Sequence, residues 1–289
     1  METDYLLENR LRELDPELHR RFRDTAVICI QMLSGYRKLF PEYTDHSELH
    51  SLTVIDSCNR LAGKKQVEML NRNEIFVLLM ACYLHDSGMG ISRNDYDLFK
   101  DKLGEEQYFR DHPDDTIADF VRTYHHEFSG LFIEKYADVF DLPSEEYVYA
   151  IRQVARGHRK TDLYDEKEYP ADYRMPDGST VCLPYLAALV RLADEIDVAA
   201  SRNPLILYDI GLLTDEVEIH ENRKLMAVSA LDVTESSFIL HTAEKDPYML
   251  DALDDMVAGM QGKLDLCRDV VEKRTRFRIS QKEVILIKH

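Results

Sequence analysis

The sequence of 289 residues predicts a mainly α-helical fold with a small α+β domain at its C-terminal end. Apolar residues recur with the 3.6-residue period of amphipathic helices through the first two-thirds of the chain, and capping residues and prolines separate these runs. After the segment "SRNP" (201–204), the pattern changes to short strand-like stretches. We therefore expect a helical domain over residues 1–205 and a small α+β domain over residues 206–289.

The first predicted helices are each bounded by a cap or a helix breaker. Asp24 can cap a helix over 24–40, which Pro41 would stop. A second helix is expected over 47–62, with Gly63 at its end. These boundaries predict two helices before the first strongly apolar run.

The following helix is apolar on nearly every side. It is expected to begin at the cap Asn73, to continue through Leu84 and to close at Gly88 and Gly90. A helix without a polar face is typical of a protein core. Its end carries His85 and Asp86, and burying ionisable groups without partners is costly, so these side chains need partners.

Four further segments complete the helical domain. A 3.6-residue period predicts a helix within 114–140, and Pro143 with Ser144 opens a helix that continues to Gly157. Residues 161–182 form a long loop that contains prolines and glycine. A last apolar helix is expected over 185–200.

The C-terminal domain alternates strand-like and helical patterns. Strands are expected in "EVEIHEN" (216–222), "KLMAVSALDV" (224–233) and "SSFILHTAE" (236–244). A helix around 246–273 follows, and "FRISQKEVILIKH" (277–289) closes the chain as one or two strands.

Composition and charge exclude several classes of function. A formal net charge of −18 argues against binding a nucleic-acid duplex, which needs a basic surface. No stretch approaches the roughly 18–20 uncharged apolar residues of a membrane span, and the charged N-terminus does not resemble a signal peptide. The odd number of widely spaced cysteines, 5, predicts reduced thiols. We therefore expect a cytoplasmic protein with no membrane segment and no zinc finger.

Histidines and aspartates occur on or at the ends of several predicted helices. They are His46, His50, His85, Asp86, His125, His126, His158 and Asp194. Helix bundles build metal sites from such inward-pointing side chains on different helices. A mixed histidine and aspartate set suits manganese, iron, cobalt, nickel or zinc rather than calcium. By spacing alone, hydrogen-bonded core histidines and a salt bridge between Arg191 and Asp194 remain as alternatives.

The order and phrasing of these residues resemble the HD-domain superfamily of metal-dependent phosphohydrolases. "LHSLTVI" is similar to the family's first histidine helix, "YLHDSG" to its HD motif, and "RLADEID" to its closing aspartate helix. The resemblance covers about residues 46–200 and implies an HD-type helical bundle. It implies that His50, His85, Asp86 and Asp194 are the shared metal ligands. His125 and His158 match the two extra histidines of the two-metal subgroup.

Two histidines remain alternatives within this resemblance. His125 and His126 point about 100° apart on a helix. We favour His125 as the ligand, because it lies nearer the apolar face and four residues before Ser129. His126 is then an alternative ligand or a hydrogen-bonding partner of the ligands. His46, one turn before His50, is expected to be a hydrogen-bonding partner or to be exposed.

The resemblance implies hydrolysis of a phosphoester in a nucleotide or nucleotide-like small molecule by a metal-activated water. The residues after the HD motif and after His158 differ from those of three subgroups, namely guanosine-tetraphosphate hydrolases, cyclic-di-GMP phosphodiesterases and deoxynucleoside triphosphate hydrolases. The alternative is a regulatory module that binds metal or nucleotide without turnover and signals through the C-terminal domain. Whether one or two ions bind, and whether the chain forms a homodimer, stays open.

A basic cluster brackets His158 and is expected to bind the substrate phosphate. Arg156, Arg159 and Lys160 are its proposed members, and with Arg152 the arginines are predicted to share one face of the preceding helix. A solvated basic face is the alternative interpretation.

Overall fold

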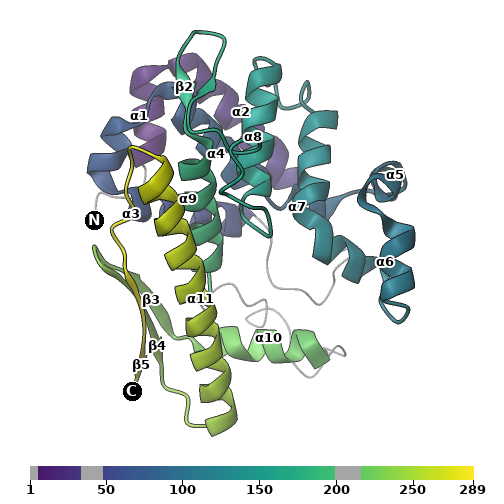
Figure 1. Ribbon diagram of the computed structural model, residues 1–289, viewed down its shortest axis with the longest axis vertical. Helices are drawn as coiled ribbons and strands as arrows, with labels where there is room; N and C mark the ends of the chain where they lie inside the picture. The colour runs from purple at the N-terminus through teal and green to yellow at the C-terminus, as the bar shows by residue number, and fades with distance from the viewer. Residues whose placement is uncertain (1–5, 34–47, 199–215) are drawn as a thin grey trace.

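The computed structural model describes residues 6–33, 48–198 and 216–289 (Figure 1). The first part is helical, as predicted, and its elements are α1 (Leu6–Leu14), α2 (Pro16–Leu33), α3 (Glu48–Met69), α4 (Arg72–Leu84), η2 (Ser87–Gly90), α5 (Arg93–Phe99), η3 (Lys100–Leu103), α6 (Glu105–Asp111), α7 (Ile117–Lys135), α8 (Glu145–Arg156), β1 (Tyr173–Arg174), β2 (Thr180–Val181) and α9 (Leu183–Glu195). The C-terminal part contains α10 (Glu216–Ala227), β3 (Ala230–Val233), β4 (Ser237–Thr242), α11 (Pro247–Arg274) and β5 (Glu283–Lys288).

Helix α4 forms the centre of the core, as its apolar sequence predicts. All its side chains from Asn73 to Leu84 are buried, and it packs against α1, α2, α3, α8 and α9. Its cap is Asn71 and not the predicted Asn73. The Asn71 side chain accepts hydrogen bonds from the backbone N–H groups of Asn73 and Glu74. In return, the Glu74 carboxylate accepts a hydrogen bond from the backbone N–H of Asn71. The Asn73 amide instead bonds to Asp177 and Ser179.

The helices predicted over 24–40 and 47–62 correspond to α2 and α3, and α1 precedes them without having been predicted. The predicted stop at Pro41 lies outside the described residues. Helix α2 begins at Pro16, because the Asp15 carboxylate accepts the N–H groups of Glu17 and Leu18 and proline suits the first helical position. Helix α3 is interrupted at Gly63, as predicted. Gly63 has a non-helical backbone, with φ of 63° and ψ of 166°, and a second helical stretch continues beyond this kink to Met69. Glycine tolerates this left-handed φ, which other residues rarely adopt.

The long segment over 161–182 is not a plain loop. It contains a two-stranded antiparallel hairpin in which Tyr173 pairs with Val181. The prediction of an entirely helical first domain is therefore wrong at this hairpin, because β1 and β2 lie before residue 205. The hairpin leads directly into α9, whose second residue is Pro184.

The C-terminal part differs from prediction at α10, which is a helix where "EVEIHEN" predicted a strand. It also covers residues 224–227 of the strand predicted over 224–233, of which β3 contains only Ala230–Val233. The three-stranded sheet has the order β3-β4-β5, antiparallel between β3 and β4 and parallel between β4 and β5. The predicted long helix is α11, which packs against β5 and α9 (Figure 1). After α11, the ring of Phe277 stacks on that of Tyr185 in α9, with centroids 4.1 Å apart.

Among the described residues, no single helix is long and apolar enough to cross a membrane. One pair, Arg72–Gly90 and Arg93–Leu103, reaches that length and composition only when joined across a 94° bend.

Candidate metal centre

Five helices bring six histidine and aspartate side chains together near the C-terminal end of α4. Helices α3, α7 and α9 each supply one side chain from within the helix, and the others follow the last residues of α4 and α8. All are buried except Asp194, which is partly exposed. They are His50, His85, Asp86, His125, His158 and Asp194.

The first group surrounds the Nε2 atoms of His50 and His85, which lie 3.1 Å apart. The Nε2 atom of His50 lies 3.4 Å from Asp86 Oδ2 and 3.4 Å from Asp194 Oδ1. The Nε2 atom of His85 lies 3.4 Å and 3.9 Å from the same two oxygens. Two imidazoles and two carboxylates thus face one point.

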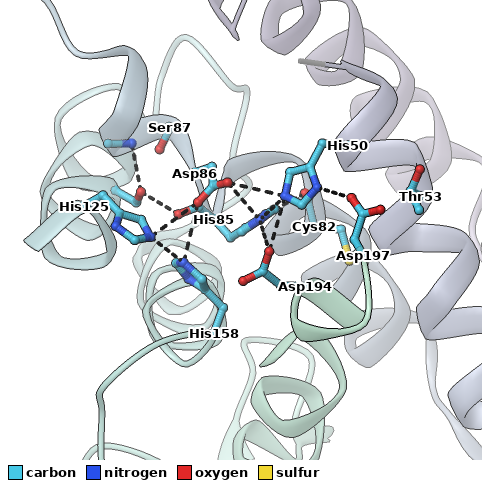
Figure 2. Close-up of polar contacts among 12 residues, drawn as sticks. His50, Thr53, Cys82, His85, Asp86, Ser87, His125, His158, Asp194 and Asp197 are labelled. Atoms are coloured by element: carbon cyan, nitrogen blue, oxygen red, sulfur yellow. Dashed lines mark hydrogen bonds and ion pairs between the residues drawn. The ribbon is translucent and has the colours of Figure 1, made fainter. Parts of the chain in front are cut away.

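The second group uses the other oxygen of Asp86. The Nε2 atoms of His125 and His158 lie 2.9 Å apart, and each lies 3.5 Å from Asp86 Oδ1. Figure 2 shows Asp86 between the two histidine pairs. One carboxylate therefore contributes one oxygen to each group, which is the arrangement needed to bridge two cations.

Contacts at Nδ1 determine which ring nitrogen faces each group. The Nδ1 atoms of His85, His125 and His158 lie 3.0, 2.6 and 2.6 Å from the backbone carbonyl oxygens of residues 82, 122 and 155, respectively. The Nδ1 atom of His50 lies 2.6 Å from Asp197 Oδ2. Carbonyl and carboxylate oxygens only accept hydrogen bonds, so each Nδ1 is the donor.

A neutral ring that donates from Nδ1 presents an unprotonated Nε2. In the second group, the Nε2 lone pairs of His125 and His158 therefore face one another at 2.9 Å without a hydrogen between them. In the first group, the Nε2 atoms of His50 and His85 lie 3.1 Å apart, where a proton on His85 or a cation can join them. A cation between them would satisfy both nitrogens, and donation from Nδ1 is the usual arrangement of metal-binding histidines. The donor set thus fits divalent transition-metal ions.

The two groups differ in electrostatics. Burial alone would lower the pKa of His85, but the carboxylates of Asp86 and Asp194 outweigh it and raise this pKa to about 9. Despite burial and the nearby Asp86, neighbouring histidines hold the pKa of Asp194 below its usual value. In the second group, burial lowers the pKa of His125 to about 3, and burial also lowers the pKa of His158. The first group therefore attracts a positive charge more strongly than the second.

A short turn holds Asp86 in this position. The Ser129 hydroxyl on α7 donates to the backbone oxygen of His85 at 2.6 Å and accepts the N–H of Gly88 at 2.8 Å. A Cβ atom on Gly88 would lie 2.2 Å from the backbone oxygen of His125. Glycine at this position therefore lets η2 approach α7 closely enough to place Asp86 beside His125.

The two histidines that the sequence left as alternatives, His126 and His46, are not among the six clustered side chains. The structure brings His125, and not His126, into the second group. His126 is buried beside it, with its Nε2 atom 3.7 Å from Glu127 Oε1 and no hydrogen-bond partner for Nδ1 among the described residues. Burial lowers the pKa of His126 to about 4. His46 lies outside the described residues.

The basic residues around His158 have different environments. Arg156 is buried, and its Nε and Nη2 atoms donate to the two oxygens of Glu127 at 2.9 and 2.7 Å. Arg159 and Lys160 are exposed. The prediction that Arg152, Arg156 and Arg159 share one helical face is wrong, because α8 ends at Arg156 and Arg159 lies beyond it.

Sequence reasoning missed the role of Asp197, the hydrogen-bonding partner of His50. The available signal was its spacing, because Asp197 follows Asp194 by three residues in "RLADEID". Helix α9 ends at Glu195, so Asp197 lies in the segment after it, and this spacing marks Asp197 as a neighbour of a predicted ligand without showing that it faces His50. The roles of Ser129 and Gly88 depend on contacts between η2 and α7, which no local pattern reveals.

Comparison with known proteins agrees with this geometry. The HD-CE family model matches residues 40–276. This match continues past residue 205 and through the whole of α11, beyond the segment that carries the sequence resemblance. The division into two domains stays a prediction. No curated protein and no solved structure matches the chain. Because the family model matches well over half of the sequence, the chain belongs to the HD-CE family, an HD-type family.

Proposed function

We propose that the protein is a metal-dependent phosphohydrolase that hydrolyses a phosphoester of a nucleotide or nucleotide-like small molecule. The observation that carries this proposal is the position of Asp86, whose two oxygens face two separate histidine pairs. Divalent cations held on both sides of one carboxylate are suited to phosphoryl displacement. Membership of an HD-type family supports the same reaction class.

The proposed ligands are His50, His85, Asp86 and Asp194 for one ion, and Asp86, His125 and His158 for a second ion. Manganese, iron, cobalt, nickel and zinc all suit this mixture of imidazoles and carboxylates. When bound, such ions would lower the pKa of a water molecule and stabilise negative charge on phosphoryl oxygens.

In this mechanism, residues of the chain orient the metal-binding imidazoles and bind the substrate phosphate. Hydrogen bonds from each Nδ1 hold the four imidazoles with Nε2 toward the centre, so little reorganisation is needed when a substrate arrives. Arg159 and Lys160, which are exposed beside His158, are proposed to bind the substrate phosphate. Arg156 is the weaker candidate, because Glu127 already accepts its hydrogen bonds.

We also infer a reducing compartment, the cytoplasm, as the site of action. All five cysteines are buried and free of disulfide bonds, which is typical of proteins kept in reducing conditions.

The test is to measure metal content and hydrolysis for the wild type and for Asp86→Ala. The wild type should retain divalent metal and hydrolyse members of a panel of nucleotides, cyclic dinucleotides and phosphoester dyes in the presence of manganese. Asp86→Ala should lose both properties, because Asp86 is the carboxylate that the two groups share. Asp172→Ala, which changes an exposed aspartate near the hairpin, is the matched control and should keep both.

Two results would change this proposal. Full hydrolysis by Asp86→Ala would refute the assignment of the site. A wild-type protein that holds metal but hydrolyses nothing on the panel would favour the alternative function, a regulatory module that binds metal or nucleotide without turnover.

A further inference from the structure

The two groups of metal-ligating side chains are unequal in number and charge. The first contains four donors, two of which are carboxylates from Asp86 and Asp194. The second contains three donors, and its carboxylate is the one that it shares, Asp86. First-row divalent ions of this kind bind four to six ligands, so the protein leaves more positions open at the second group.

Positive charge lies beside the second group. Arg159 and Lys160 directly follow His158 and are exposed. Among the described residues, no ion pair of either side chain is found, whereas Arg156 is paired with Glu127. Because Arg159 directly follows His158, its positive charge lies close to the second group and opposes the binding of a second cation there.

A hydrogen-bonding group without a partner also lies at this side. The Nδ1 atom of His126 is buried and has no partner among the described residues. The His126 ring centroid lies 5.9 Å from that of His125 and 6.5 Å from that of His158. A buried polar atom without a partner is costly, and a ligand bound at this side can supply one.

We propose that the second group is an incomplete site, which the phosphoryl group of the substrate completes. Asp86, His125 and His158 then bind an ion tightly only when a phosphate anion binds with it. The phosphate would supply oxygen ligands at the open positions and offset the charges of Arg159 and Lys160, and His126 would hydrogen-bond to it. The ligand class is a phosphate monoester or a terminal phosphate, which carries at least two free oxygens. This inference rests on the proposed function.

The experiment measures manganese binding to the full chain, first stripped of metal, with and without inorganic phosphate. Free Mn²⁺ is followed by electron paramagnetic resonance during the titration. We expect one tightly bound ion without phosphate and two with phosphate, with the dissociation constant of the second ion lowered by at least about tenfold. By linkage, manganese must strengthen phosphate binding by the same factor.

Arg159→Gln separates this coupling from a structural role of the arginine. With phosphate present, the second ion should bind severalfold more weakly to this variant, because one phosphate contact is lost. Without phosphate, the second ion should bind no more weakly than to the wild type, because the substitution removes a repelling charge. A structural role would instead weaken the ion in both conditions. Arg174→Gln on the hairpin is the matched control and should behave as wild type.

The outcomes distinguish this inference from the proposed function. Two ions bound with equal affinity without phosphate, or a single ion in both conditions, would overturn the inference and leave a metal site intact. Failure of the stripped wild type to bind any manganese would overturn the proposed function and the inference with it.

Discussion

The hydrogen bond at His50 differs from those at the other three clustered histidines. The rings of His85, His125 and His158 each donate Nδ1–H to a backbone carbonyl three residues earlier, so their orientation follows from the local chain. His50 donates instead to the carboxylate of Asp197, which lies beyond the end of α9. A carboxylate partner makes the imidazole a stronger base than a carbonyl partner does, and therefore a better metal ligand.

This difference predicts a metal-binding defect in Asp197→Ala. Loss of the carboxylate should weaken the first ion about 10- to 100-fold, because His50 loses both its orientation and the negative charge behind it. Asp197→Asn keeps a hydrogen-bond acceptor and should show a smaller loss. Manganese titration of both variants measures the effect. Equal affinity in Asp197→Ala and wild type would show that Asp197 does not position His50.

Gly88 predicts a loss of stability together with a loss of metal binding. Alanine there would place its Cβ 2.2 Å from the backbone oxygen of His125 and 2.7 Å from the backbone nitrogen of Ser129. Backbone cannot move aside as a flexible side chain can, so η2 should shift away from α7. We expect Gly88→Ala to lower the free energy of unfolding by about 1–3 kcal/mol or more, as measured by urea denaturation.

Gly259 in α11 provides the control for this substitution. A Cβ there meets no atom within 4 Å, so Gly259→Ala should be neutral or should stabilise the protein by up to about 1 kcal/mol. If Gly88→Ala is as stable as Gly259→Ala, the close approach of η2 and α7 does not contribute to the stability of the fold.

At the level of elements, the N-terminal end of α4 predicts a role for Asn71. The reciprocal bonds between Asn71 and Glu74 satisfy N–H groups that a helix end otherwise leaves unpaired. Asn71→Ala should therefore cost about 0.5–2 kcal/mol of unfolding free energy, whereas Asn71→Ser, which keeps a capping oxygen, should cost less. Urea denaturation at neutral pH compares the two variants. Equal losses would indicate that the cap is not the source of the effect.

The elements that the sequence predicts well are those with long and consistent patterns. Helices α4, α7, α9 and α11 each bury many apolar side chains, so a 3.6-residue period or an unbroken apolar run identifies them. Helix α10 was missed because the strand prediction rested on two alternating apolar residues, Val217 and Ile219. Such a short alternation does not distinguish a strand from a helix. Its later residues, "RKLMA", favour a helix.

Sequence reasoning could place each candidate residue of the site on, or at the end of, a predicted helix. The structure brings together the six side chains that the sequence suggests as ligands, with His125 and not His126 in the second group, and their binding of metal stays a prediction. Contacts between elements were beyond sequence reasoning. The bond from His50 to Asp197 and the packing of Gly88 on α7 join residues 147 and about 40 positions apart in the chain. No local periodicity encodes such pairs.

At the scale of the whole molecule, the candidate metal centre joins helices that lie far apart in sequence. Helices α3, α4, α7, α8 and α9 each contribute at least one of the six side chains, and all of them pack around α4 or α8. Apart from the adjacent His85 and Asp86, successive donors are separated by 33 to 39 residues along the chain, so a preformed site does not exist in the unfolded state. Metal that binds only the folded state must therefore stabilise it.

This linkage predicts a rise in the melting temperature on adding manganese to protein that has been stripped with a chelator. An ion at about 100 times its dissociation constant adds about 2.7 kcal/mol to the free energy of unfolding. For a chain of this size, that corresponds to a rise of roughly 5 °C, which calorimetry can measure. Asp86→Ala should show no rise, because it removes the carboxylate common to both groups, whereas Asp172→Ala should show the full rise. An equal rise in Asp86→Ala would mean that manganese stabilises the fold from somewhere other than this centre.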